Sequence, residues 1–200
     1  MAKRKIKKKK GFFKENWNSS LKYLKACKKF IFAAALIFIF FVLAGYFIPV
    51  PDFISQKILE LVNELLKQTE GMSWSQLTTF IFFNNLKSSF FGMFLGIILG
   101  IFSFLTLATN GYILGFVSTR VVSSEGFTIL WKLLPHGIFE LPALLISMGL
   151  GMKMGTFVFK KKKKKSLKDF FVNSIKVFLF IVIPLLFIAA LIEGAFIFLF

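Results

Sequence analysis

The longest uncharged stretch of this sequence sets the strongest limit on its fold. Residues 88–119 are 32 consecutive residues without Asp, Glu, Lys or Arg. A single helix of that length would reach about 48 Å, whereas the hydrocarbon core of a bilayer is about 30 Å thick. The chain of 200 residues is 56% hydrophobic and contains 30 Phe, too much apolar surface for a soluble domain of this size to bury. A lipid bilayer is therefore the expected solvent for most of the chain.

These stretches predict an all-α fold, a polytopic transmembrane helical bundle of about five membrane segments with one extracytoplasmic amphipathic helix. The predicted spans are residues 30–48, 88–109, 112–122, 131–154 and 177–200. The pair Asn110-Gly111, typical of a helix end and turn, separates the second span from the third. The third span is too short to cross the hydrocarbon alone, so a re-entrant element within residues 112–134 stays open.

Residues 52–70 have the pattern of an amphipathic helix. Apolar side chains recur at spacings of three and four, at Ile54, Ile58, Leu61 and Leu65, and polar side chains fill the other face. Such a helix lies on a membrane surface or against a partner protein. We expect this one on the extracytoplasmic side.

The charge distribution predicts the orientation. The net charge is +17, and the lysines gather in an N-terminal tail, residues 1–29, and in a loop, residues 160–168. Basic segments that flank apolar spans mark the cytoplasmic side. The chain is therefore predicted to be a multi-pass protein of the cell membrane, with residues 30–200 as its membrane domain, a cytoplasmic N-terminus and an extracytoplasmic C-terminus. The basic segments are expected to contact anionic lipid, and no nucleic acid is expected as a partner.

Small residues at intervals of four predict how two helices pack. One stripe contains Gly92, Gly96 and Gly100. The other contains Ser147, Gly151 and Gly155. Stripes of this kind let helix backbones approach closely in lipid. We predict that the two stripes pack against each other.

Ionisable residues at membrane depth are the candidates for a functional site. His136 and Glu140 are four residues apart on one helix face, and Glu193 lies in the last predicted span. Three functional interpretations are open: a proton or ion pathway, a metal site, and a hydrolytic site. With one histidine in the chain, the ligands are too few for a typical zinc site, so no metal and no cofactor are predicted. The structural alternative is a buried hydrogen-bonded cluster that fixes helix register.

Three strings resemble the stage II sporulation protein M family: residues 83–86, residues 134–143, which read LPHGIFELPA, and residues 189–193. Asn110-Gly111 fits the same pattern. The resemblance adds Asn84, Asn85 and Asn110 to the candidate intramembrane polar cluster of His136, Glu140 and Glu193. The family's namesake is a membrane scaffold that recruits cell-wall hydrolases during engulfment, without an accepted catalytic activity of its own.

The resemblance implies a non-catalytic membrane scaffold or assembly factor, not an enzyme. Its expected partners are the lipid bilayer and other membrane or cell-envelope proteins, or a second copy of the chain. The alternative is a small transporter or channel for protons, ions or a small solute that uses the intramembrane His/Glu cluster.

Overall fold

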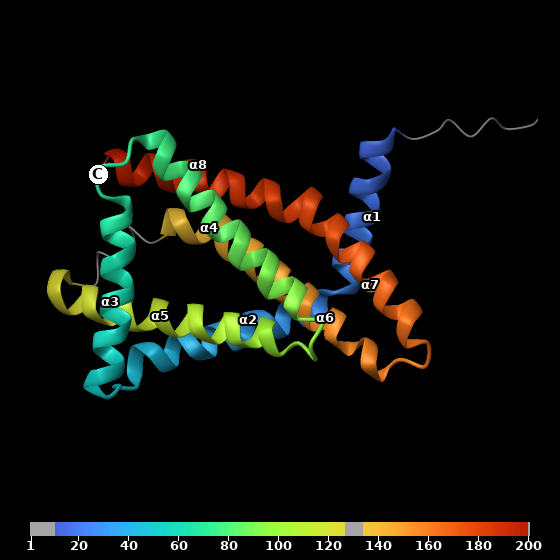
Figure 1. Cartoon of the computed structure of the whole chain (residues 1–200), viewed down its shortest axis with the longest axis horizontal. Helices are drawn as coiled ribbons and strands as arrows, with labels where there is room; N and C mark the ends of the chain where they lie inside the picture. Colours follow the sequence, from blue (N-terminus) through green and yellow to red (C-terminus); the bar gives the residue numbers. More distant parts are fainter. Residues whose placement is uncertain (1–10, 127–133, 200) are drawn as a thin grey trace, which may run out of the picture.

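The computed structural model describes residues 11–126 and 134–199 (Figure 1). Within these ranges the side chains of a few residues are not described: 12, 124, 125, 134–136, 198 and 199. Every regular element in the described part of the chain is helical, which confirms the all-α bundle.

Apolar helices make up the body of the molecule (Figure 1). They are α2 (Lys28–Phe47), α4 (Trp74–Leu95), α5 (Ile101–Glu125), α6 (Leu134–Gly155) and α8 (Ile183–Leu199). In the described residues, four helical stretches are long and apolar enough to cross a membrane: Lys28–Phe47, Ile101–Ser123, Gly137–Phe159 and Lys163–Ile197. The 22 residues of α4 reach about 33 Å, and this helix packs against both α6 and α8.

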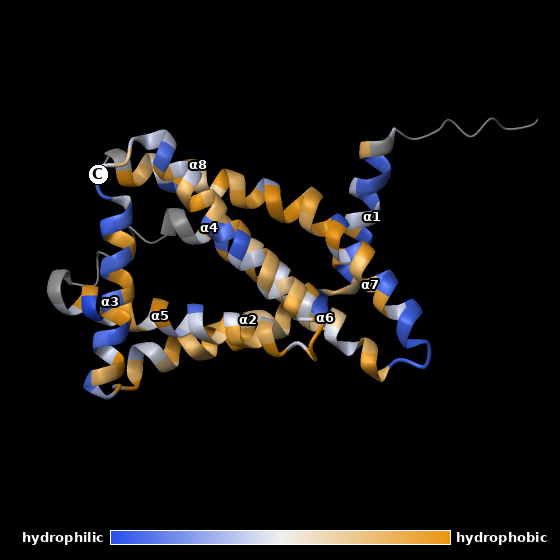
Figure 2. Cartoon of the chain, viewed as in Figure 1, coloured by the Kyte–Doolittle hydropathy of each residue, from blue (hydrophilic) through white to orange (hydrophobic). Residues whose placement is uncertain are grey.

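Hydrophilic residues gather at the two ends of the bundle (Figure 2). At one end, the lysine end, lie α1 (Phe12–Ala26) and α7 (Lys163–Val177). At the other, α3 (Asp52–Thr69) crosses the bundle axis. We call that end the α3 end. The amphipathic helix predicted at residues 52–70 is confirmed as a helix, and it begins just after Pro51.

The chain turns at residues 96–100 and not at Asn110-Gly111, so the predicted spans 88–109 and 112–122 are wrong. Leu99 and Gly100 adopt positive φ angles of 53° and 77°, which end α4 and allow α5 to start. Asn110 lies inside α5, where its amide nitrogen donates to the Thr106 carbonyl at 2.8 Å. Gly111 is a packing residue, because a β-carbon there would lie 2.7 Å from the Phe38 carbonyl oxygen of α2. In the segment in which a re-entrant element was considered, α5 is thus continuous up to Glu125. Residues 127–133 lie outside the described ranges.

The two small-residue stripes lie against each other in the structure. A β-carbon on Gly96 would lie 2.6 Å from the Cα of Gly151, and one on Gly155 would overlap the backbone nitrogen of Gly100. The buried Ser103 hydroxyl donates to the Gly92 carbonyl at 2.8 Å and ties α5 to α4. The turn between α4 and α5 therefore sits on α6 with the backbones in direct contact.

The last two helices form one helical stretch with a local widening. A π-helical turn, η3 (Phe178–Val182), joins α7 to α8 directly before Pro184. Proline lacks a backbone N–H and its ring crowds the preceding turn, so a wider turn accommodates it. The predicted loop 160–168 is only partly a loop, because α7 already begins at Lys163.

The basic N-terminal segment is not a simple tail. In α1, Phe13 packs edge-on against Phe180, and the Tyr23 hydroxyl donates to the Phe170 carbonyl at 3.5 Å. Cys27 joins α1 to α2 and is fully buried. Burial raises the pKa of the Cys27 thiol, so it stays protonated and unreactive at neutral pH.

We expect Gly115→Ala to lower the stability of the bundle. A β-carbon at Gly115 would overlap the Val42 carbonyl oxygen, so α2 and α5 would have to separate, at a cost of about 1–3 kcal/mol. Gly137→Ala is the matched control. Its β-carbon would meet nothing closer than Leu141 Cδ1 at 3.4 Å, and helical alanine gains roughly 0.5–1 kcal/mol over glycine. Thermal unfolding in detergent measures both, and equal melting temperatures for the two variants would contradict this packing.

Candidate functional site

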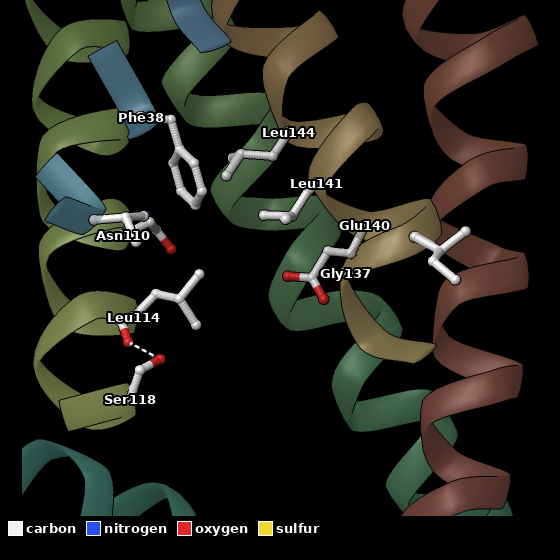
Figure 3. Close-up of a pocket in the computed structure, with 10 residues that line it drawn as sticks. Phe38, Asn110, Leu114, Ser118, Gly137, Glu140, Leu141 and Leu144 are labelled. Atoms are coloured by element: carbon white, nitrogen blue, oxygen red, sulfur yellow. Dashed lines mark hydrogen bonds between the residues drawn. The ribbon is translucent and has the colours of Figure 1, made fainter. Parts of the chain in front are cut away.

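A cavity of about 440 Å³ lies between α2, α5 and α6 (Figure 3). Most of its described wall is apolar and comes from six side chains on these three helices: Phe38, Val42, Leu114, Ile138, Leu141 and Leu144. This is the size range of small-ligand pockets, whose walls are usually apolar with a few placed polar groups.

Two polar side chains point into the cavity from different helices. The carboxylate of Glu140 enters from α6, and the amide of Asn110 enters from α5 (Figure 3). The Ser118 hydroxyl also lines the cavity, but it donates its hydrogen to the Leu114 carbonyl at 2.7 Å. The cavity therefore offers a carboxylate and a carboxamide at membrane depth, where polar groups are costly unless they face protein or an internal space.

The cavity lies toward the α3 end and is closed toward the lysine end. Beyond Leu144, the side chains of Leu107 and Met148 are fully buried and pack with Ala34 and Phe38. Further along, Leu150 and Met154 are also fully buried. With the glycine contacts between α6 and the α4–α5 turn, these side chains fill the lysine-end half of the bundle.

Sequence comparison supplies the family. The model of the family "Stage II sporulation protein M" matches residues 34–196. The chain belongs to this family. It is also similar to two uncharacterized proteins of Methanocaldococcus jannaschii. One is 34% identical over 171 residues, covering 82% of this chain and 76% of the relative. The other is 37% identical over 118 residues, covering 55% of this chain and 65% of the relative. The search of solved structures gave no match.

The string 134–143, which carried the stage II sporulation protein M resemblance, forms the first turns of α6. Gly137, Ile138, Glu140 and Leu141 of this string line the cavity. Its proline-rich composition suits a helix start, although Pro142 lies inside α6. The side chain of His136 lies outside the described part of the structure.

Three other candidate residues lie on α4 and α8. Asn84 and Asn85 are in the middle of α4 and do not cap a helix, because α4 starts at a capping box of Ser73 and Gln76. Glu193 is half-buried on α8, and it is not among the described residues that line the cavity. Its neighbour Gly194 packs against Thr78 of α4. Of the six predicted polar residues, the described cavity wall thus contains Asn110 and Glu140.

Two cations have structural roles that the sequence analysis did not predict. Arg120 of α5 donates to the buried Ser55 of α3 at 2.9 Å and lies 5.3 Å from the Phe116 ring centre, which fixes α3 to the bundle. Lys153 of α6 lies 5.1 Å from the ring centres of both Phe30 and Phe170. In the sequence each is an isolated basic residue near a helix end, and nothing there indicates its ring partners.

We expect cysteine labelling to distinguish the open half of the bundle from the closed half. Leu141→Cys lines the cavity and should react readily with a small water-soluble maleimide. Leu150→Cys is the control on the same helix, and it should react only after denaturation because Leu150 is fully buried. The native Cys27 should not react with the maleimide in either variant, because its thiol is buried and the pKa of the thiol is raised. Equal labelling rates at the two positions would contradict the conclusion that the lysine-end half of the bundle is closed.

Proposed function

We propose that this member of the stage II sporulation protein M family is a membrane protein that binds a proton or a small cationic solute inside its bundle, as a transporter does. One observation carries the proposal: the Glu140 carboxylate and the Asn110 amide point into a cavity of about 440 Å³ at membrane depth.

The composition of the wall favours a cationic ligand. Glu140 is the one ionisable residue among the described residues that line the cavity, and a carboxylate attracts a cation or holds a proton. The Asn110 amide nitrogen donates to the Thr106 carbonyl, so its oxygen is the atom that can accept a hydrogen bond from a cationic ligand. The apolar remainder of the wall suits a solute with a hydrocarbon body.

The proposed role is non-catalytic. The hydroxyl in the described wall, that of Ser118, gives its hydrogen to a backbone carbonyl and is not activated by a base there.

The positive-inside rule places the lysine end at the cytoplasm and the α3 end outside. With α2, α4, α5, α6 and α8 as five crossings, the N-terminus is then cytoplasmic and the C-terminus extracytoplasmic. In this orientation the cavity lies in the outer half of the membrane and its inner end is closed by Leu107 and Met148. Release to the cytoplasm requires α6 to move away from α5 and from the α4–α5 turn, and Met148, which packs on Gly92, to move with it.

The first test is cation and proton flux in proteoliposomes. We expect flux that depends on Glu140, reduced at least tenfold in Glu140→Gln because the amide cannot carry the charge or the proton. Glu60→Gln, an exposed carboxylate on α3, is the matched control and should keep the wild-type rate. Melting temperatures show that both variants are folded. Absence of flux from wild type across pH 5–9, or equal flux in Glu140→Gln and wild type, would reject the proposal.

A scaffold is the second candidate, and helix α3 favours it. Ile58 of the apolar face is buried against the bundle, but Leu61 and Leu65 of the same face are exposed at 54% and 46%, while Arg120 holds the helix in place. A fixed apolar face of this kind suits a partner protein at the outer membrane surface.

Photo-cross-linking in native membranes tests the scaffold. A cross-linking residue at Leu61 should give a discrete protein adduct, and the same residue at Phe40, an exposed position of the spanning helix α2, should give lipid adducts. Lipid adducts alone at both positions would mean that α3 lies in the membrane surface without a partner.

A further inference from the structure

We infer that a groove at the corner between α1 and α2 binds an anionic phospholipid from the leaflet at the lysine end. This groove has a volume of about 450 Å³, and its lining is Leu24, Lys25, Lys28, Ile31, Phe32 and Ala35. The inference does not depend on the proposed transport function, because the groove and the Glu140 cavity share no lining residue.

The corner exists because α1 meets α2 at Cys27 with no loop between them. Helix α1 leaves the bundle at a steep angle to α2 (Figure 1) and is held there by its contacts with α7. Cys27 is fully buried, so it fixes the inner side of the corner. The outer side is left as a groove that runs from the end of α1 onto the first turns of α2.

The floor of the groove has the chemistry of an acyl-chain site. Leu24, Ile31, Phe32 and Ala35 are all apolar, and the last three lie on a helix long and apolar enough to span the membrane. That part of the floor faces the hydrocarbon, where a lipid chain is the molecule present at highest concentration. A nucleic acid or a soluble anion would gain nothing from these four side chains.

Two lysines flank the apolar floor of the groove and line it with their hydrocarbon stems. Lys25 and Lys28 are exposed on either side of the corner, at the end of the floor that lies nearest the lysine end. The described residues that line the groove include no acidic side chain to neutralise them. Lysines at this depth attract anionic headgroups, each with about 1 kcal/mol near the surface. Charge and apolar floor together select a molecule with a negative head and a hydrocarbon tail.

The experiment is native mass spectrometry of the intact chain, exchanged into nanodiscs of phosphatidylglycerol and phosphatidylcholine at equal amounts. We expect wild type to retain phosphatidylglycerol selectively. The double variant Lys25→Gln/Lys28→Gln should lose that preference by roughly thirtyfold, the factor that corresponds to about 2 kcal/mol for two lysines. Lys163→Gln/Lys164→Gln removes the same charge at the same end of the bundle, outside the groove, and should retain the preference.

A second variant tests the groove itself without changing the charge. Ala35→Trp places an indole on the floor and should reduce retention of both lipids, with the lysines intact. Inorganic phosphate should not displace phosphatidylglycerol, because it lacks a chain for the floor. The inference is overturned if the two lysine pairs have equal effects, if Ala35→Trp retains lipid as wild type does, or if phosphate competes.

Discussion

Backbone contact at glycines is the constraint on which the arrangement of this bundle depends. Lipid offers helices no hydrophobic gain for associating, so close van der Waals packing has to hold them together. Gly96, Gly151 and Gly155 bring the α4–α5 turn onto α6, and Gly111 and Gly115 bring α5 onto α2. A methyl group at any of these five positions would meet backbone or buried side-chain atoms. The places of α2, α4, α5 and α6 relative to one another follow from these contacts.

The same constraint explains why the cavity lies where it does. The tight glycine contacts between α6 and the α4–α5 turn are concentrated toward the lysine end, where Leu107 and Met148 complete the packing. Toward the α3 end, the described residues of α6 and α5 make no such close contact at a glycine. The space between the two helices there is lined by longer side chains and by Glu140. A carboxylate in a membrane helix must face protein or an internal space, and this is the part of α6 that provides one. A binding site that opens to one side of a membrane at a time needs a tightly packed part and an open part.

The sequence predicted the fold class, the helix across one end and the pairing of the two small-residue stripes, because each depends on a local pattern. It failed at Asn110-Gly111. That pair is typical of a turn in water-soluble proteins, but in a membrane helix glycine also serves close packing, and Gly111 contacts α2. The real turn lies within the glycine stripe itself, at Leu99 and Gly100, where the sequence analysis saw one continuous helix face. Glu140 and Asn110 were both candidates, but that they share one cavity could not be read from residues 30 positions apart on different helices.

What the sequence by itself determined is the solvent of this protein and the depth of its residues. The lengths of the apolar stretches, the lysine clusters and the apolar periodicity of residues 52–70 are properties of consecutive residues. They are enough to favour insertion of a segment into a bilayer or its location at the bilayer surface. What only the tertiary structure decided is which polar residues meet and which half of the bundle is closed. Those depend on how close two backbones come, and a glycine in a sequence does not say which helix it will touch. The cavity beside Glu140 and the corner groove beside Lys25 both follow from such contacts between helices.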